Sequence, residues 1–283
     1  MPEKLKIGGE NMPERKTPDK ETYNTDEIEK YLAELEKDPK KLEKFGEMAE
    51  ARAKDIYESG GFENEFQAGD LVLYAGAGTG HVPKYIEERH EDIKMVKIDL
   101  ADIRTSDTKE GETRYAKANV RNLPFEDNSL DTVCLFDILH HTENQEEILK
   151  EARRVLKPGG KILILEDTIP EPYKRGADTM KKLVGKMDDM FNKQAKGVNP
   201  HNYHSISDWE IMFHKQGFDV DANDTKSWYW GPRDFLPEKM KGERPESRTL
   251  GRPFESSLFK IIKGEEPEKE PDFTEEEEKW FKN

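Results

Sequence analysis

Three glycines at alternating positions are the first residues whose type and spacing suggest chemistry. Gly76, Gly78 and Gly80 directly follow the apolar run 71–75, and a segment with helical periodicity follows them. Glycine adopts positive φ at little steric cost and lets a ligand come close to the backbone. The pattern predicts a strand, a turn that cradles part of a ligand, and a helix. A glycine-rich turn that binds nothing is the alternative at this point.

A carboxylate lies at a matching distance along the chain. Asp99 directly follows the segment Met-Val-Lys-Ile at 95–98, nineteen residues after Gly80. An acid at the carboxyl end of the second strand of such a unit can accept hydrogen bonds from both ribose hydroxyls of a nucleoside. A dinucleotide fingerprint would place a glycine at position 81, where this chain has His81. The spacing therefore disfavours a nicotinamide dehydrogenase.

Two further motifs follow in order. The segment 119–125 ends in Leu-Pro-Phe, and the segment 153–160 ends a predicted helix in Lys-Pro-Gly-Gly. The Lys-Pro-Gly-Gly motif is ordinary turn chemistry by itself. The order and spacing of all four motifs, rather than any one of them, indicate the class of protein.

Alternating strands and helices must position these residues from Asp70 onward. We expect strands at 71–75, 94–100, 114–119, 131–136, 161–166, 218–228 and 257–263, and helices at 80–90, 144–156, 180–193 and 207–216. Such alternation is typical of a parallel sheet covered on both faces. We predict an α/β fold with a Rossmann-like, doubly wound, mainly parallel seven-stranded sheet, an antiparallel last strand pair and added N-terminal helices.

Polar ends flank this α/β domain, which we place at 62–263. Residues 1–22 are predicted to be disordered or loosely attached, and 264–283 to form an acidic tail. Two helices are predicted within 23–61, one from position 25 and one over 40–59. They either form a lid over a substrate cleft or pack on the outside.

Composition narrows the function classes. The formal net charge of −15 repels phosphate backbones, so nucleic acid is not the expected substrate. The single cysteine, Cys134, lies in an apolar run and is predicted to be a buried thiol. The sequence has no run of about 20 apolar residues and no apolar N-terminal signal. We expect a cytoplasmic protein without a membrane span.

Residues 70–167 resemble the class I S-adenosylmethionine-dependent methyltransferases, in particular the small-molecule, ubiquinone/menaquinone-type ("type 11") branch. The resemblance rests on the four motifs and continues more weakly through 202–218. It implies S-adenosylmethionine as the cofactor and methyl transfer to an oxygen, nitrogen or carbon atom of a small molecule. No metal is expected, and the oligomeric state is not predicted.

The resemblance also implies the cofactor contacts. The glycine turn would cradle the methionine and ribose parts, Asp99 would hold the ribose, and Asn119 and Val120 would border the adenine. The expected contacts are Tyr74, Ala75, Gly76, Ala77, Gly78, Gly80, Asp99, Leu100, Asn119, Val120 and Phe136. The family usually has an acid where this chain has Tyr74, and Asp where it has Asn119. Asp137 is the nearest acid that could replace the one missing at position 74.

Two histidines are the candidate catalytic residues. His141 follows the fourth strand at a position where the family often has histidine, and His204 lies in a segment that resembles a substrate-facing loop. Packing or helix capping is the alternative role for each. His201 and His204 have a metal-like spacing, but no third ligand of matching pattern is evident. Glu166 and Asp167 end the fifth strand and would either orient a substrate or cap the next segment.

Two other functions remain open. A nucleic-acid methyltransferase of the amino-directed kind would carry Asn/Asp-Pro-Pro-aromatic after the fourth strand, where this chain has Phe-Asp-Ile-Leu at 136–139. A degenerate, non-catalytic S-adenosylmethionine-binding regulatory module is the second alternative, and Tyr74 is its main support.

Overall fold

The structure is a computed structural model of the chain. It describes residues 34–60, 64–109, 114–142, 144–169, 202–220, 225–228 and 255–264. The predicted helix 180–193, the segments 1–22 and 23–33, and the tail from 265 onward lie outside these residues.

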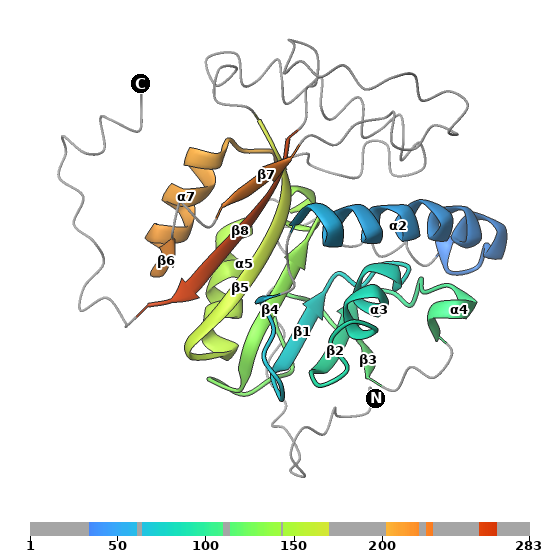
Figure 1. Cartoon of the computed structure of the whole chain (residues 1–283), viewed down its shortest axis with the longest axis horizontal. Helices are drawn as coiled ribbons and strands as arrows, with labels where there is room; N and C mark the ends of the chain where they lie inside the picture. Colours follow the sequence, from blue (N-terminus) through green and yellow to red (C-terminus); the bar gives the residue numbers. More distant parts are fainter. Residues whose placement is uncertain are drawn as a thin grey trace.

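The strands of the described part form one sheet with the order β3-β2-β1-β4-β5-β8-β6, and β7 also pairs with β8 (Figure 1). Their bounds are β1 Leu71–Ala75, β2 Lys94–Asp99, β3 Tyr115–Lys117, β4 Leu130–Phe136, β5 Leu156–Thr168, β6 Phe218–Val220, β7 Lys226–Trp228 and β8 Glu255–Lys263. β1 to β5 pair in parallel, whereas β8 is antiparallel to β5, β6 and β7. The predicted mainly parallel, Rossmann-like sheet with antiparallel last strands is confirmed.

The strand order reverses between β1 and β4. From β1 the sheet proceeds through β2 to β3 on one side and through β4 to β5 on the other. In open parallel sheets, ligands bind beyond the carboxyl ends of the strands at such a switch point. The glycine turn leaves β1 there, and Asp137 leaves β4 beside it.

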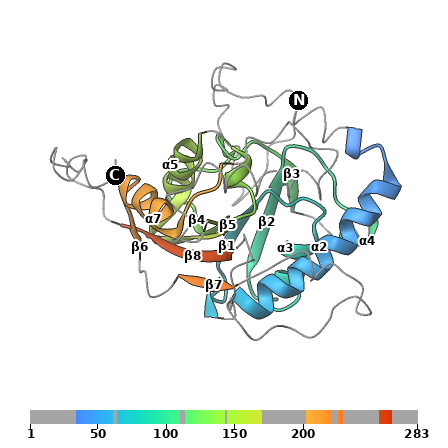
Figure 2. The ribbon, with the colours of Figure 1, turned by 90° about the horizontal axis from the view of Figure 1, so that it is seen from above.

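Helices cover both faces of this sheet, with α5 and α7 on one side and α2 and α3 on the other (Figure 2). The helical segments are α2 Pro39–Gly60, α3 His81–Glu87, α4 Ser106–Lys109, the 3-10 turn η2 Leu139–His141, α5 Gln145–Val155 and α7 Ile206–Lys215. Alternate residues of each strand point to opposite faces. On β4, Val133 and Leu135 therefore pack with α5 and α7, whereas Cys134 and Phe136 pack on the side of α3. Cys134 is fully buried, as predicted.

The prediction of one continuous strand over 218–228 was wrong. Phe218 pairs with Lys263, but Lys226 pairs with Leu258. An uninterrupted antiparallel strand in the first register would put Lys226 opposite Glu255, so the two registers require two strands. This division makes the sheet eight-stranded rather than seven-stranded.

The Lys-Pro-Gly-Gly motif lies inside β5 rather than before it. The pairing of β4 with β5 moves from Leu130↔Leu156 directly to Thr132↔Lys161, with an irregularity between the two pairs. Gly159 within this stretch has φ +74°, which glycine tolerates best. The predicted turn is therefore a bulge within a longer strand.

Helix α2 crosses the carboxyl edge of the sheet. Near its start, Leu42 packs in a small cluster with Ala101 and Ile103, which follow β2. Toward its end, Arg52 contacts Asp137 after β4, and Ile56 is buried in the core on the side of α3. The helix thus spans the edge where ligands bind in this fold, and its role as a substrate lid remains a prediction. Among the described residues, no helix is both long and apolar enough to span a membrane.

The third and fourth sequence motifs meet at one side chain. The Arg154 guanidinium of α5 donates to the carbonyl oxygens of Leu123 and Phe125, at 3.2 and 2.9 Å. It also donates to the carboxylates of Glu151 and Asp127, at 2.7 Å each. Arg154 therefore fixes the Leu-Pro-Phe segment against α5.

We expect Arg154→Met to lower the free energy of unfolding by about 1–3 kcal/mol, because charge-assisted bonds are lost and two carbonyl groups lose their donor. Urea unfolding followed by circular dichroism measures the change. Lys150→Met on the same helix removes an exposed cation and serves as the control, with an expected change within about 0.5 kcal/mol. Equal effects of the two substitutions would contradict this role of Arg154.

Candidate functional site

The glycine turn after β1 is anchored to β2. Gly76, Gly78 and Gly80 have φ angles of +78°, +54° and +89°. The amide groups of Gly76 and Ala77 both donate to the carbonyl oxygen of Ile98, at 2.9 and 3.0 Å. All three glycines thus occupy the left-handed region that other residues rarely adopt.

The three glycines differ in what surrounds them. A Cβ at position 76 would lie 2.3 Å from Ile138 Cγ2, and one at position 80 would lie 2.8 Å from Thr108 Oγ1. At Gly78, by contrast, no heavy atom lies within 4 Å of such a Cβ. Packing within the protein therefore requires glycine at 76 and 80, whereas Gly78 leaves open space next to the backbone. The sequence could not separate these roles.

Asp99, at the end of β2, holds the glycine turn through hydrogen bonds. Its Oδ2 accepts a hydrogen bond from the Gly78 amide, and its Oδ1 accepts one from the Leu100 amide, each at 2.7 Å. Burial raises the pKa of the Asp99 carboxyl, and these backbone donors oppose that rise. Each carboxylate oxygen has a second lone pair, so Asp99 can still accept bonds from a ligand. The sequence analysis predicted a ligand contact and missed the role of Asp99 in holding the turn.

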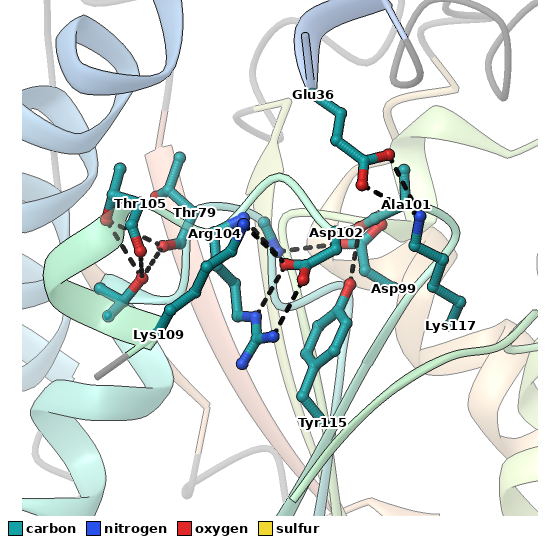
Figure 3. Close-up of polar contacts among 12 residues, drawn as sticks. Glu36, Thr79, Asp99, Ala101, Asp102, Arg104, Thr105, Lys109, Tyr115 and Lys117 are labelled. Carbon is teal, nitrogen blue, oxygen red and sulfur yellow. Dashed lines mark hydrogen bonds and ion pairs between the residues drawn. The ribbon is translucent and has the colours of Figure 1, made fainter. Parts of the chain in front are cut away.

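The segment after Asp99 is held from several sides (Figure 3). The Tyr115 hydroxyl donates to the carbonyl oxygen of Ala101 at 2.6 Å, and the Arg104 guanidinium lies 3.8 Å from the Tyr115 ring centroid. Arg104 also donates to both carboxylate oxygens of Asp102, at 2.9 and 3.0 Å. Leu100, a predicted cofactor contact, is half-buried at the start of this fixed segment.

The predicted adenine neighbours lie in the turn after β3. The side-chain oxygen of Asn119 accepts a bond from the Arg121 amide at 3.0 Å, and its carbonyl accepts one from the Asn122 amide. Val120 is half-buried and packs against the core on the side of α5. Asn119 therefore shapes the turn, and its contact with adenine remains a prediction.

Tyr74 and Phe136 form part of the core below the glycine turn. Their exposed fractions are 2% and 3%, and their rings meet edge to face with centroids 5.4 Å apart. Burial raises the pKa of Tyr74 well above its ordinary value, so the phenol carries no charge at neutral pH. The side chain at position 74 therefore cannot replace the charge of the acid that the family usually has there.

Asp137, the acid that the sequence analysis expects to replace the one missing at position 74, directly follows β4. Its carboxylate pairs with Arg52 of α2, with Nε–Oδ2 and Nη2–Oδ1 distances of 3.3 Å. Arg52 Nη2 also lies 3.9 Å from Asp167 Oδ1, at the end of β5. The sequence analysis did not identify Arg52. The available signal was an arginine on the apolar face of a predicted helix, between Ala49, Ala53 and Ile56.

Glu166 holds the loop that follows β4. It is fully buried, and its Oε1 accepts bonds from the amides of Ile138 and Leu139, at 3.1 and 2.6 Å. Its Oε2 lies 2.5 Å from His140 Nδ1. Burial raises the pKa of Glu166, while the nearby His140 lowers it. Glu166 therefore holds the loop after β4, which precedes it in the chain, and the sequence analysis did not predict this role.

The two candidate catalytic histidines lie in connected segments. The His141 ring lies 3.9 Å from that of His140, which stacks on Tyr203. His204 Nε2 lies 2.8 Å from Gln145 Oε1, and its ring meets Trp209 at 4.8 Å. These contacts orient both rings, and their catalytic roles remain predictions. His201 lies outside the described residues, within which no group of three or more metal-binding side chains is found.

The fold and the site are those of a Rossmann-like nucleoside-binding protein. The sheet has an antiparallel β8, and the glycine turn at the switch point is bonded to the Asp99 carboxylate. Comparison with known proteins agrees. Residues 73–164 match the family model described as a methyltransferase domain. A ubiquinone/menaquinone biosynthesis C-methyltransferase UbiE from Escherichia fergusonii is 31% identical over 155 residues, which cover 47% of this chain and 61% of that protein. The chain thus spans about three fifths of that relative's length.

Solved structures show the same fold. YcgJ from Bacillus subtilis has a TM-score of 0.54 and 19% identity, and the match covers 74% of this chain and 99% of that one. A geranyl diphosphate C-methyltransferase from Streptomyces coelicolor, solved with Mg²⁺, geranyl diphosphate and S-adenosyl-L-homocysteine, has a TM-score of 0.54 and 15% identity over 80% of this chain and 84% of that one. These two structures show the fold, while the domain match and the UbiE relatives support the methyltransferase class that the sequence predicted.

The open space at Gly78 gives a direct test of ligand binding. Gly78→Ala and Gly69→Ala each place a Cβ in open space at positive φ, +54° and +87°. Both should lower the free energy of unfolding by about 1–2 kcal/mol through backbone strain. Only Gly78→Ala should weaken S-adenosylhomocysteine binding in calorimetric titration, by about tenfold or more, because Gly69 precedes β1 at the opposite end of the strand. Equal affinities would mean that the ligand does not approach Gly78.

Asp99→Ala should weaken both cofactor binding and the fold. The amides of Gly78 and Leu100 lose their acceptor, so we expect the free energy of unfolding to fall by about 1–3 kcal/mol. Asp92→Ala removes an exposed acid just before β2 and should change neither quantity. Thermal unfolding with and without S-adenosylhomocysteine measures both effects. Unchanged stability in Asp99→Ala would contradict the anchoring role.

Proposed function

We propose that this chain is an S-adenosylmethionine-dependent methyltransferase that acts on a small molecule, with carbon as the favoured acceptor atom. The observation that carries the proposal is the open space next to Gly78, whose amide donates to the Asp99 carboxylate. The match of residues 73–164 to a methyltransferase domain supports the reaction class. The C-methyltransferase relatives support carbon over oxygen and nitrogen.

The residues at the switch point fit this cofactor. Gly78 leaves room for a ligand against the backbone, and Asp99 keeps lone pairs for the ribose hydroxyls. Asp137 offers a carboxylate for an ammonium group at the end of β4. When bound, the cofactor supplies an activated methyl group on a sulfonium. The chain itself must align the acceptor and exclude water.

The residues of this chain supply the remaining chemistry. Glu166 holds the loop that carries His141, and Gln145 orients the ring of His204. A general base is needed only where the acceptor keeps its proton at neutral pH, and these two histidines are our candidates for that role. The acidic net charge of −15 supports a small molecule over nucleic acid as the acceptor.

One observation favours a second function. The position that usually carries an acid in this family holds Tyr74, whose ring is buried in the core. A chain that bound the cofactor without transferring its methyl group would be a regulatory module. Measurements of binding and of transfer must therefore be made separately.

S-adenosylmethionine and S-adenosylhomocysteine should raise the melting temperature, whereas NAD should not. A ligand at 100 times its dissociation constant stabilises the native state by about 2.7 kcal/mol. Transfer is measured with methyl-labelled S-adenosylmethionine and a panel of reduced quinones, phenols and amines, followed by extraction of labelled product. Stabilisation by NAD alone would refute the proposal. Binding without label transfer to any acceptor would favour the regulatory module.

A further inference from the structure

A buried cation from α2 lies at the ligand edge of the sheet. Arg52 is only 9% exposed, and its guanidinium reaches the carboxylates that follow two neighbouring strands. Asp137 after β4 is its nearer partner, at 3.3 Å, and Asp167 at the end of β5 lies 3.9 Å away. A guanidinium taken so far out of water must be paired, and these two acids are among its partners.

This ion pair adjoins the glycine turn. Asp137 precedes Ile138, whose side chain occupies the place where a Cβ of Gly76 would be. The charges of Asp137, Arg52 and Asp99 all act on the buried phenol of Tyr74, and those of the two acids contribute to its raised pKa. The pair therefore lies on the β4 side of the turn, as Asp99 lies on the β2 side.

The backbone at Asp137 is held in a strained conformation. Its φ of +53° is uncommon for a residue with a side chain. The Asp137 amide donates to the Leu165 carbonyl at 2.8 Å, and Glu166 binds the next two amides. Strain that the surroundings maintain in this way concentrates at ligand sites.

The ion pair between Arg52 and Asp137 is longer than a tight one. Charge-assisted bonds between a guanidinium and a carboxylate usually measure about 2.7–2.9 Å. Three contacts join Arg52 to Asp137, and each measures 3.3 Å. The pair and Asp167 together offer two negative charges and one positive charge. An α-amino acid group, which has an ammonium and a carboxylate on one carbon, matches both signs.

We propose that Arg52 and Asp137 bind the amino-acid end of S-adenosylmethionine. Asp137 accepts hydrogen bonds from the ligand ammonium, and Arg52 donates to the ligand carboxylate. The contacts to the ligand thus replace the direct contacts between Arg52 and Asp137, which move apart, and α2 contributes a binding residue to the site. This inference rests on the proposed function and explains how the site works without an acid at position 74.

Three ligands separate the two contacts in calorimetric titration. S-adenosylmethionine has both charged groups, decarboxylated S-adenosylmethionine lacks the carboxylate, and methylthioadenosine lacks the whole amino-acid end. For the unchanged protein, we expect S-adenosylmethionine to bind about 10- to 100-fold more tightly than its decarboxylated form, the size of a charge-assisted contact.

Arg52→Met should abolish this preference. Binding of S-adenosylmethionine should fall about 10- to 100-fold, while the decarboxylated form and methylthioadenosine keep their affinities. Arg52→Lys retains the charge but not the planar fork and should give an intermediate preference. Asp137→Asn should weaken both ligands that have the ammonium and leave methylthioadenosine unaffected. Lys54→Met, at an exposed site on the same helix, should change nothing.

The ligand series also distinguishes the ways of failing. If the unchanged protein binds none of the three ligands, the proposed function is wrong. If it binds S-adenosylmethionine and Arg52→Met binds it equally well, the function stands and the role of Arg52 is refuted. If Arg52→Met weakens all three ligands alike with the fold intact by circular dichroism, Arg52 only docks α2, and the inference is likewise refuted.

Discussion

The Asp99 carboxylate is the interaction on which the candidate site depends. It is half-buried at the end of β2, and each of its oxygens accepts a backbone amide, from Gly78 on one side and Leu100 on the other. Burial makes an ionised carboxylate costly unless such donors are present. The same two bonds give the glycine turn its shape. One side chain therefore both holds the turn and offers the acceptor for a ligand.

A second carboxylate, which is fully buried, has the corresponding role on the other side of the switch point. Glu166 at the end of β5 accepts the amides of Ile138 and Leu139, and thereby fixes the loop after β4. That loop places Ile138 against Gly76. The two loops at the switch point are therefore each held by an acid from the neighbouring strand, and they pack on one another. A substitution of either acid would therefore alter the positions of both loops.

Helix α2 adds a third boundary that the sheet alone does not provide. Its first part packs on the segment after β2 through Leu42, and Gly46 lies close against His81 and Thr105. Its later part reaches Asp137 through Arg52. The helix contacts the residues that follow β2 and β4, next to Leu100 and including Asp137, which are expected to contact the cofactor. Ligand binding and the docking of α2 should therefore be coupled.

The sequence by itself determined the class of fold, because apolar runs and glycine turns at regular spacing are local signals. It identified the strands of the parallel sheet, the turn at Gly78 and the acid at Asp99. It did not determine the two registers on β8, since strand pairing depends on residues far apart in the chain. It also could not assign partners to buried charges. Arg52 and Asp137 are 85 positions apart, and only the packing of α2 across the sheet brings them together. The tertiary structure likewise showed that packing requires glycine at 76 and 80, whereas Gly78 adjoins open space. That difference depends on neighbours from other segments of the chain.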